Sequence, residues 1–112
     1  MKSDMSHSFG MQVTLKAVKG KGEKLAQIML QAAQLIENLP GCQTYIVIRS
    51  MSDSDQIMIT EIWDSQQTHQ ASLANPEISR LINCTRSLIT QMEHQAGRPL
   101  NGKNPGLRHV CA

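Results

Sequence analysis

The sequence predicts one α+β domain in which helices pack on a four-stranded antiparallel sheet. Two apolar, β-branched runs flank the polar residues 51–55, a pattern typical of an antiparallel hairpin. Elsewhere one segment alternates apolar and polar residues as a strand does, and two segments have apolar residues at helical spacing. A chain of 112 residues can bury roughly two-thirds of its unfolded surface, so we expect a single core.

The first strand is predicted over about residues 9–18, after a small, polar and flexible N-terminal segment, 1–8. Its apolar side chains share one face, at Phe9, Met11, Val13, Leu15 and Ala17. The segment 19–22 contains two glycines and ends the strand. It lacks the spacing and the Lys-Ser/Thr pair of a phosphate-binding loop, so we expect no nucleotide site there.

A helix is predicted over residues 23–39. Its apolar positions recur every three or four residues and form one buried stripe: Leu25, Ile28, Met29, Ala32, Leu35, Ile36 and Leu39. Pro40 and Gly41 end the helix and turn the chain into the hairpin.

Both hairpin strands are apolar on both faces. Tyr45 and Val47 alternate with Ile46 and Ile48, and the strand ending at Trp63 has the same character. A sheet with one wet face alternates more cleanly than this. Because so short a chain has helices for one face only, we expect a second copy to cover the other face and form a homodimer.

A split helix is predicted after Trp63. Asp64 or Ser65 can cap a short first part, and Asn75 followed by Pro76 is a second start signal. The second part has its buried stripe at Ile78, Leu81, Ile82, Thr85 and Ile89.

Residues 88–95 fit either a continued helix or a strand, and we favour a strand from about Ile89 because it gives the sheet a fourth member. The order strand, helix, strand, strand, split helix, strand is that of a ferredoxin-like split βαβ fold, here over residues 9–96. Residues 97–112 are predicted to form an irregular, basic tail.

Composition and charge disfavour nucleic acid as a partner. Aromatic residues make up 3% of the chain, too few for a base-stacking platform. The formal net charge is +2, and the last residues supply it through Arg98, Lys103 and Arg108. The one basic cluster in the domain, at Lys16, Lys19, Lys21 and Lys24, fits a solvated loop and helix start better than a phosphate site.

The cysteines and the N-terminus predict a cytoplasmic protein. Three cysteines, at positions 42, 84 and 111, have neither metal-ligand nor redox spacing, which favours reduced thiols. We expect Cys42 and Cys84 to be buried as small apolar residues. The sequence has neither an apolar N-terminal targeting segment nor a run long enough to cross a membrane.

An ordered set of short motifs resembles the antibiotic biosynthesis monooxygenase (ABM) family. The set consists of Leu-Pro-Gly-Cys at 39–42, the hairpin, the segment 61–69 with Glu61, Trp63 and His69, and the Asn75-Pro76 helix start. The resemblance implies a dimeric ferredoxin-like α/β barrel with a pocket between sheet and helices, near Trp63. It also implies one of several activities: cofactor-free oxygenation of aromatic polyketides, quinol oxygenation, haem degradation, or isomerisation of a phosphorylated signal molecule.

The sequence departs from the family pattern at several positions. Position 69 is commonly aromatic in the family, and here it is His69, while position 72 is often histidine and here it is Ser72. Three functional residues of the haem-degrading members align with Val13, Ser72 and Ile82 of this chain. At none of these positions does the chain have the residue of those members. We therefore do not expect haem degradation.

His69 is the candidate catalytic residue. A neutral imidazole next to the Trp63 junction could accept a phenolic proton, although a histidine that only caps or hydrogen-bonds the helix is the alternative. Trp63 is a candidate substrate-binding residue, with a ring that could wall the pocket and an indole N–H that could bind a substrate oxygen. Its alternative is a core aromatic at the end of the sheet.

Three further residues are candidates for substrate binding. Tyr45 could hydrogen-bond a quinol or simply pack on the sheet, and Ser72 could be a polar contact. Glu61 lies in an apolar strand and must be paired, exposed or shifted towards the neutral acid. For Glu61 we expect a structural partner, Arg49, on the neighbouring strand.

The sequence therefore predicts a homodimeric, cofactor-independent monooxygenase of a small phenol or quinol or a polyketide-like substrate, with molecular oxygen as co-substrate. It lacks zinc spacing, a dinucleotide fingerprint and a catalytic triad, so we expect neither metal nor cofactor. The alternatives are a non-catalytic small-molecule-binding dimer, and an isomerase of a small phosphorylated carbonyl compound with Lys16 or Lys19 on the phosphate.

Overall fold

The computed structural model describes residues 7–100, so most of the predicted N-terminal segment 1–8 and most of the predicted tail 97–112 lie outside that range. The strands are β1 (Phe9–Ala17), β2 (Cys42–Arg49), β3 (Gln56–Trp63) and β4 (Ile89–Gly97). The helices are α1 (Gly22–Ile36), α2 (Gln66–Leu73) and α3 (Pro76–Thr85), with the 3₁₀ turn η1 (Arg86–Leu88) before β4. The predicted α+β class and element order are confirmed.

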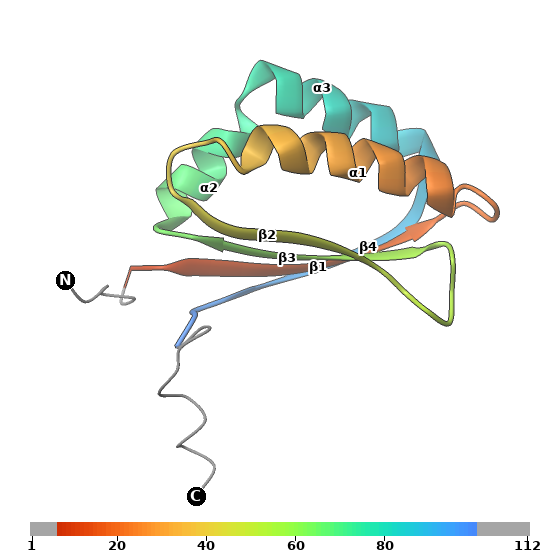
Figure 1. Cartoon of the computed structure of the whole chain (residues 1–112), viewed down its shortest axis with the longest axis horizontal. Coiled ribbons are helices and arrows are strands. Elements are labelled where there is room, and N and C mark those ends of the chain that lie inside the picture. Colours follow the sequence, from red (N-terminus) through yellow and green to blue (C-terminus); the bar gives the residue numbers. More distant parts are fainter. Residues whose placement is uncertain (1–6, 101–112) are drawn as a thin grey trace, which may run out of the picture.

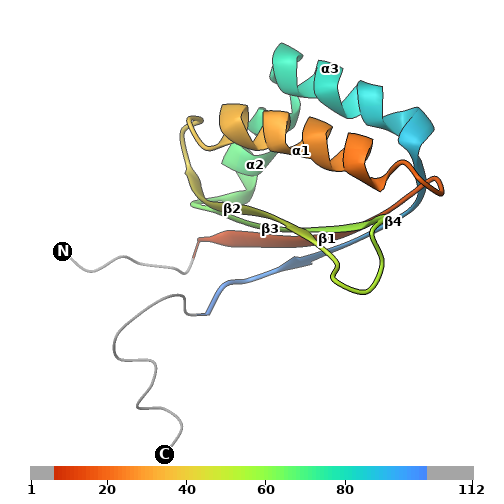
Figure 2. The ribbon, with the colours of Figure 1, turned by 45° about the vertical axis from the view of Figure 1, so that its right-hand side comes forward.

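One antiparallel sheet forms the base of the domain, with strand order β2-β3-β1-β4. All three helices lie on the same face of this sheet (Figure 1), and the turned view shows the same two layers (Figure 2). The two long connections, through α1 and through α2 with α3, place β1 and β3 in the middle of the sheet. This is the ferredoxin-like arrangement.

Helix α1 is amphipathic as predicted but shorter at its C-terminal end. It buries Leu25, Met29, Ala32 and Ile36 against the sheet. The helix ends at Ile36 because the residue before Pro40 is sterically kept out of the helical region. Residues 37–39 form tight turns instead, with the Leu39 amide donating to the Ile36 carbonyl at 2.9 Å.

Side-chain caps define where α2 and α3 begin. Ser65, rather than Asp64, caps α2, because its hydroxyl accepts a hydrogen bond from the Thr68 amide at 3.2 Å. The Asn75 side chain accepts from the amides of residues 77 and 78, with Pro76 in the first turn of α3. Helix α3 ends at Thr85, so Ile89 belongs to β4, and the predicted fourth strand is confirmed.

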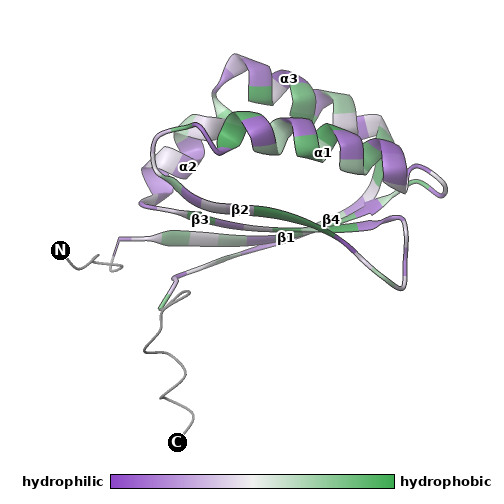
Figure 3. Cartoon of the chain, in the orientation of Figure 1, coloured by the Kyte–Doolittle hydropathy of each residue, from purple (hydrophilic) through white to green (hydrophobic). Residues whose placement is uncertain are grey.

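The alternation along β1 and β3 separates an inner from an outer sheet face. On β3 the residues Ile57, Ile59, Glu61 and Trp63 are buried beneath the helices. The outer face has no helix over it in the described part of the chain, and it exposes 49% of Ile46 and 45% of Ile48 (Figure 1). Apolar colouring continues along β2 in Figure 3, which agrees with the predicted two-sided apolar character of the hairpin.

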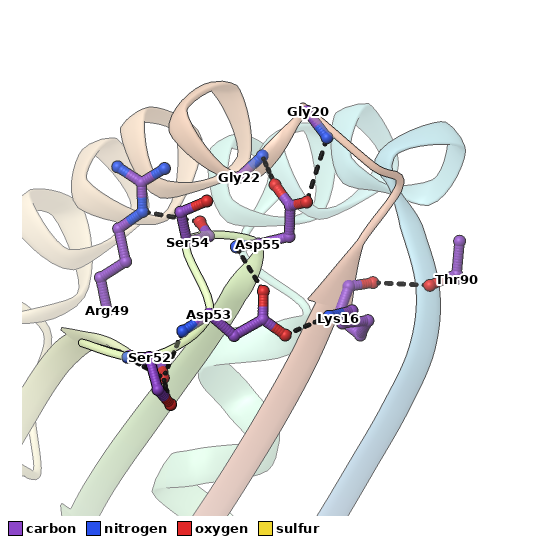
Figure 4. Close-up of polar contacts among 10 residues, drawn as sticks. Lys16, Gly20, Gly22, Arg49, Ser52, Asp53, Ser54, Asp55 and Thr90 are labelled. Atoms are coloured by element: carbon purple, nitrogen blue, oxygen red, sulfur yellow. Dashed lines mark hydrogen bonds and ion pairs between the residues drawn. The ribbon is translucent and has the colours of Figure 1, made fainter.

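At the turn end of the hairpin, acidic residues fix the start of α1. The Asp55 carboxylate accepts hydrogen bonds from the amides of Gly22 at 2.9 Å and Gly20 at 3.0 Å (Figure 4). Gly20 has a φ of +82°, a conformation that glycine adopts without strain. Lys16 on β1 pairs with the Asp53 carboxylate. The predicted basic cluster thus supplies at least one structural ion pair.

Arg49 is part of this exposed network and does not reach Glu61. Its Nε donates to the Ser54 carbonyl at 2.8 Å (Figure 4), and its Nη1 lies 2.6 Å from a Glu23 oxygen on α1. The register opposes Arg49 to Ile57, four residues away from Glu61 along β3, or roughly 13 Å at the rise of a strand. The predicted Arg49–Glu61 pair is therefore wrong.

Candidate active site

A cavity of about 340 Å³ lies between the inner face of the sheet and the helices. This volume is at the lower end of the range for pockets that bind small molecules. All four strands and all three helices contribute to its wall. Four of the five predicted site residues line it: Tyr45, Glu61, His69 and Ser72.

Trp63, the fifth predicted residue, does not line the cavity. Its side chain is fully buried, and its indole Nε1 donates a hydrogen bond to Glu61 Oε1 at 2.9 Å. Both side chains point to the same face because they are two residues apart on β3. Trp63 therefore lies behind Glu61 and holds the carboxylate in position.

Glu61 is a buried carboxylate at the wall of the cavity, 9% exposed. The sheet register places it between Met11 on β1 and Tyr45 on β2, neither of which is charged. Burial raises the pKa of the Glu61 carboxyl above its ordinary value of 4.5, although the Trp63 hydrogen bond and His69 act in the opposite direction. A carboxyl with a raised pKa can exchange a proton closer to neutral pH.

His69 faces Glu61 from helix α2. Its Nε2 is 3.7 Å from Glu61 Oε1, within ion-pair range but too long for a hydrogen bond. The imidazole centroid lies 5.0 Å from the Phe9 ring and 5.9 Å from the Trp63 ring, edge to face with the latter. His69 is 9% exposed, so packing of two aromatic rings fixes its position at the cavity wall.

Tyr45 and Ser72 offer hydroxyl groups to the same cavity. Burial first, and the nearby Glu61 and Cys42 next, raise the pKa of the Tyr45 phenol, which therefore stays protonated and can donate a hydrogen bond. The Ser72 hydroxyl donates to the backbone carbonyl of His69 at 2.6 Å. Because the hydroxyl proton is already donated to this carbonyl, Ser72 can only accept a hydrogen bond from a ligand.

The remaining lining residues were not predicted as site residues. Met11, Met29 and Met92 supply thioether groups, and His94 reaches the cavity from β4, where the register places it beside Val13. Met92 is 55% exposed and Leu73 on α2 is 49% exposed, so the lining reaches the molecular surface at these two residues. The alternating pattern of residues 88–95 could have indicated that Met92 and His94 line the same surface, because it places both on one face of a strand.

Glu61 is the only acidic side chain among the described lining residues, which include neither lysine nor arginine. Within residues 7–100, no group of three or more His, Cys, Asp and Glu could hold a metal ion. The cysteines differ from the prediction: Cys84 on α3 is exposed, and Cys42 is half-buried. The chemistry of the wall is thus one carboxylate, two imidazoles and hydroxyls in apolar surroundings.

Comparison with known proteins agrees with this fold. The model of the antibiotic biosynthesis monooxygenase family matches residues 8–83, and the chain belongs to that family. A Chloroflexus aurantiacus protein assigned to these monooxygenases is 35% identical, with a TM-score of 0.78 over 87% of this chain and 97% of its own. A similarly assigned Deinococcus radiodurans protein is 26% identical, with a TM-score of 0.76 over 86% and 96% of the two chains.

SnoaB from Streptomyces nogalater, described as a cofactor-independent oxygenase, has the same fold at 14% identity. Its TM-score is 0.77 over 88% of this chain and 98% of its own. Among curated proteins, none matches the chain. In the described part of the chain, every helix is too short or too polar to span a membrane. The cytoplasmic location stays a prediction.

Proposed function

We propose that this protein is a cofactor-independent monooxygenase that binds a small phenol or quinol in the cavity between sheet and helices. The observation that supports it is the pairing of His69 with Glu61 at the wall of a mostly apolar cavity. An imidazole can accept a proton near neutral pH, and the apolar wall excludes water from the reacting groups. Membership of the ABM family agrees with this class of reaction.

In the proposed reaction the substrate supplies the electrons and His69 accepts the proton. The phenolate passes one electron to molecular oxygen, and the substrate radical and superoxide combine to form a carbon–oxygen bond. The resulting peroxide anion takes up the proton held by His69 to become a hydroperoxide. Its O–O bond and the C–H bond at the same carbon then break as water leaves, which gives a quinone with one oxygen atom in the product and the other in water. The proton held by His69 leaves with that water, so the protein ends unchanged.

The other predicted residues have supporting roles in this proposal. Tyr45 donates a hydrogen bond to a substrate oxygen, because its phenol stays protonated. Ser72 can accept one from a second hydroxyl. Trp63 acts through Glu61, whose carboxylate it holds, and does not wall the ring as the sequence analysis suggested.

A ligand-binding protein without catalysis is the second candidate. It is favoured by Ser72, where many family members have a histidine and where the hydroxyl proton is already bonded to the backbone. The phosphate-isomerase alternative has less support: Lys16 is paired with Asp53, and neither lysine nor arginine is among the described lining residues.

Oxygen uptake by metal-free protein, with quinols and polycyclic phenols and with autoxidation subtracted, tests the proposal. We expect His69→Gln to lower the turnover number by about 100-fold or more, the usual contribution of a general base. His7→Gln is the matched control, because His7 is an exposed histidine outside the cavity lining. Equal turnover in wild type and His69→Gln would contradict the role of His69, and tight binding without turnover would favour the binding protein.

We also propose that a second copy covers the outer face of the sheet. Ile46 and Ile48 are about half exposed there, side by side on the same face of β2. Burying them against an identical surface would form a two-fold symmetric dimer. Light scattering at micromolar concentration should give the dimer mass for wild type and the monomer mass for Ile46→Lys. A wild-type monomer would contradict the proposal.

A further inference from the structure

We propose that Glu61 makes the cavity select uncharged aromatic hydroxyl compounds over carboxylates and phosphates of the same size. The inference rests on the proposed function in taking this cavity as the substrate site. It does not depend on turnover, because it concerns which ligands enter and stay.

The position of Glu61 supports this role. Its carboxylate is 9% exposed, is anchored by the Trp63 indole at 2.9 Å, and lines the cavity from the inner face of the sheet. A group held in this way cannot swing out to solvent when a ligand arrives. Its neighbours across the sheet, Met11 and Tyr45, are neutral at physiological pH.

Two cations of the sheet are held by other groups. Lys16 is paired with Asp53 and Arg49 donates to the Ser54 carbonyl at the turn end of the hairpin (Figure 4), and Arg49 also pairs with Glu23 on α1. Among residues 7–100 neither lysine nor arginine lines the cavity. An entering anion would thus lose its hydration and face a carboxylate in a medium of low dielectric constant.

His69 does not remove this penalty. Its Nε2 lies 3.7 Å from Glu61 Oε1, so a proton on the imidazole would mainly neutralise Glu61 and leave no net positive charge for an anionic ligand. His94, the other histidine of the wall, is exposed to water on β4.

An uncharged hydroxyl compound is not repelled by Glu61 and can donate a hydrogen bond to it. Glu61 Oε1 accepts from Trp63, whereas Oε2 accepts no hydrogen bond from side chains within residues 7–100. Because Glu61 lines the cavity, a phenolic O–H can donate to this oxygen. A hydrogen bond to a carboxylate is stronger than one between neutral groups, so the same residue rejects anions and holds phenols.

Calorimetric titration with two matched naphthols tests the inference. Methyl 6-hydroxy-2-naphthoate is uncharged at neutral pH, and 6-hydroxy-2-naphthoate has the same rings and hydroxyl with a negative charge. We expect the ester to bind at least about tenfold more tightly than the smaller acid, because the Glu61 carboxylate repels the carboxylate of the acid. In Glu61→Gln the preference for the ester should fall by at least about threefold, and the remaining preference reflects the hydration that an anion loses in an apolar cavity.

Two variants control for folding and for net charge. Glu61→Asp keeps the carboxylate and should keep the preference for the ester. Glu93→Gln removes the same charge from an exposed residue of β4 outside the cavity lining and should leave the preference unchanged. Circular dichroism of each variant checks its fold before titration.

Three results would overturn the inference: equal affinities for ester and acid in wild type, an unchanged preference in folded Glu61→Gln, or no binding of either compound at millimolar concentration. The oxygenase proposal fails separately. Selective binding without oxygen uptake would contradict the monooxygenase alone, and oxygen uptake without charge selection would contradict the role of Glu61 alone.

Discussion

The two ends of strand β3 place carboxylates in opposite surroundings. Before its first residue, Asp53 and Asp55 accept hydrogen bonds from Lys16 and from the backbone amides that start α1. Near its last residue, Glu61 is buried with Trp63 and His69. The hydrogen bond from Lys16 lowers the pKa of Asp53 below 3.8, whereas burial raises the pKa of Glu61 above 4.5.

This difference separates structural from functional carboxylates. At the turn end Asp53 has a cation and Asp55 has backbone donors, so these carboxylates fix the backbone. At the cavity end the partners are an indole and an imidazole, which leave the carboxylate able to bind or release a proton. Clusters of the second kind occur preferentially at functional sites. Variants at the two ends should therefore differ in how much they lower the free energy of unfolding, and in the sign of the change in its pH dependence.

The largest loss of stability is expected from Trp63→Phe. The substitution leaves a space in the core and removes the hydrogen bond to the buried Glu61, and together these should lower the free energy of unfolding by about 2–3 kcal/mol. Arg49→Gln, which breaks an exposed pair at the turn end, should cost much less. Urea unfolding followed by circular dichroism measures both, and equal losses would remove the distinction between the two ends.

A smaller loss is expected from Asp55→Ala at the turn end. The Asp55 carboxylate accepts from two amides at the start of α1, and its removal should lower the free energy of unfolding by about 1–2 kcal/mol. Asp55→Asn retains one acceptor and should lose about half as much. Urea unfolding again gives the values. If Asn and Ala were equally destabilising, the charge rather than the hydrogen bonds would be the cause.

Local chemistry made most of the fold predictable. The alternation along 9–17, the apolar stripe of α1 and the Asn75-Pro76 cap each depend on neighbours in sequence. Helix ends were less predictable, because Pro40 acts on the turn before it and α1 stops at Ile36. Which face of the hairpin lies beneath the helices was not predictable, because both faces of both strands are apolar in sequence.

The partners within the site were harder to predict. The contact between the Phe9 and His69 rings joins residues sixty positions apart in the chain, and no local pattern indicates it. The wrong partner for Glu61 was avoidable, because a turn at 51–55 already opposes Arg49 to Ile57 and Tyr45 to Glu61. The hydrogen bond from Trp63 to Glu61 could also have been predicted, since residues two apart on a strand share a face.

The two ends should also give opposite dependences of stability on pH. Because the pKa of Glu61 is raised, the folded state binds its proton more tightly, so Glu61 contributes stability at low pH that is lost as pH rises above 4.5 through its raised pKa. Because the pKa of Asp53 is lowered, its contribution is present above 3.8 and lost as pH falls below that value. Unfolding curves of Glu61→Gln and Asp53→Asn, each subtracted from wild type across pH, measure both slopes. Slopes of the same sign would contradict the comparison.

The smallest effect is expected from Lys16→Gln, which also tests the phosphate alternative. The Lys16–Asp53 pair is partly exposed, and pairs of this kind contribute little at physiological ionic strength. We expect urea unfolding of this variant to agree with wild type within error, and oxygen uptake and naphthol binding to be unchanged. Inorganic phosphate should not compete with the naphthol ester in either protein, because Lys16 is outside the cavity lining. Competition that is lost in Lys16→Gln would instead mean that the turn end binds ligand, and the division between a structural and a functional end of β3 would fail.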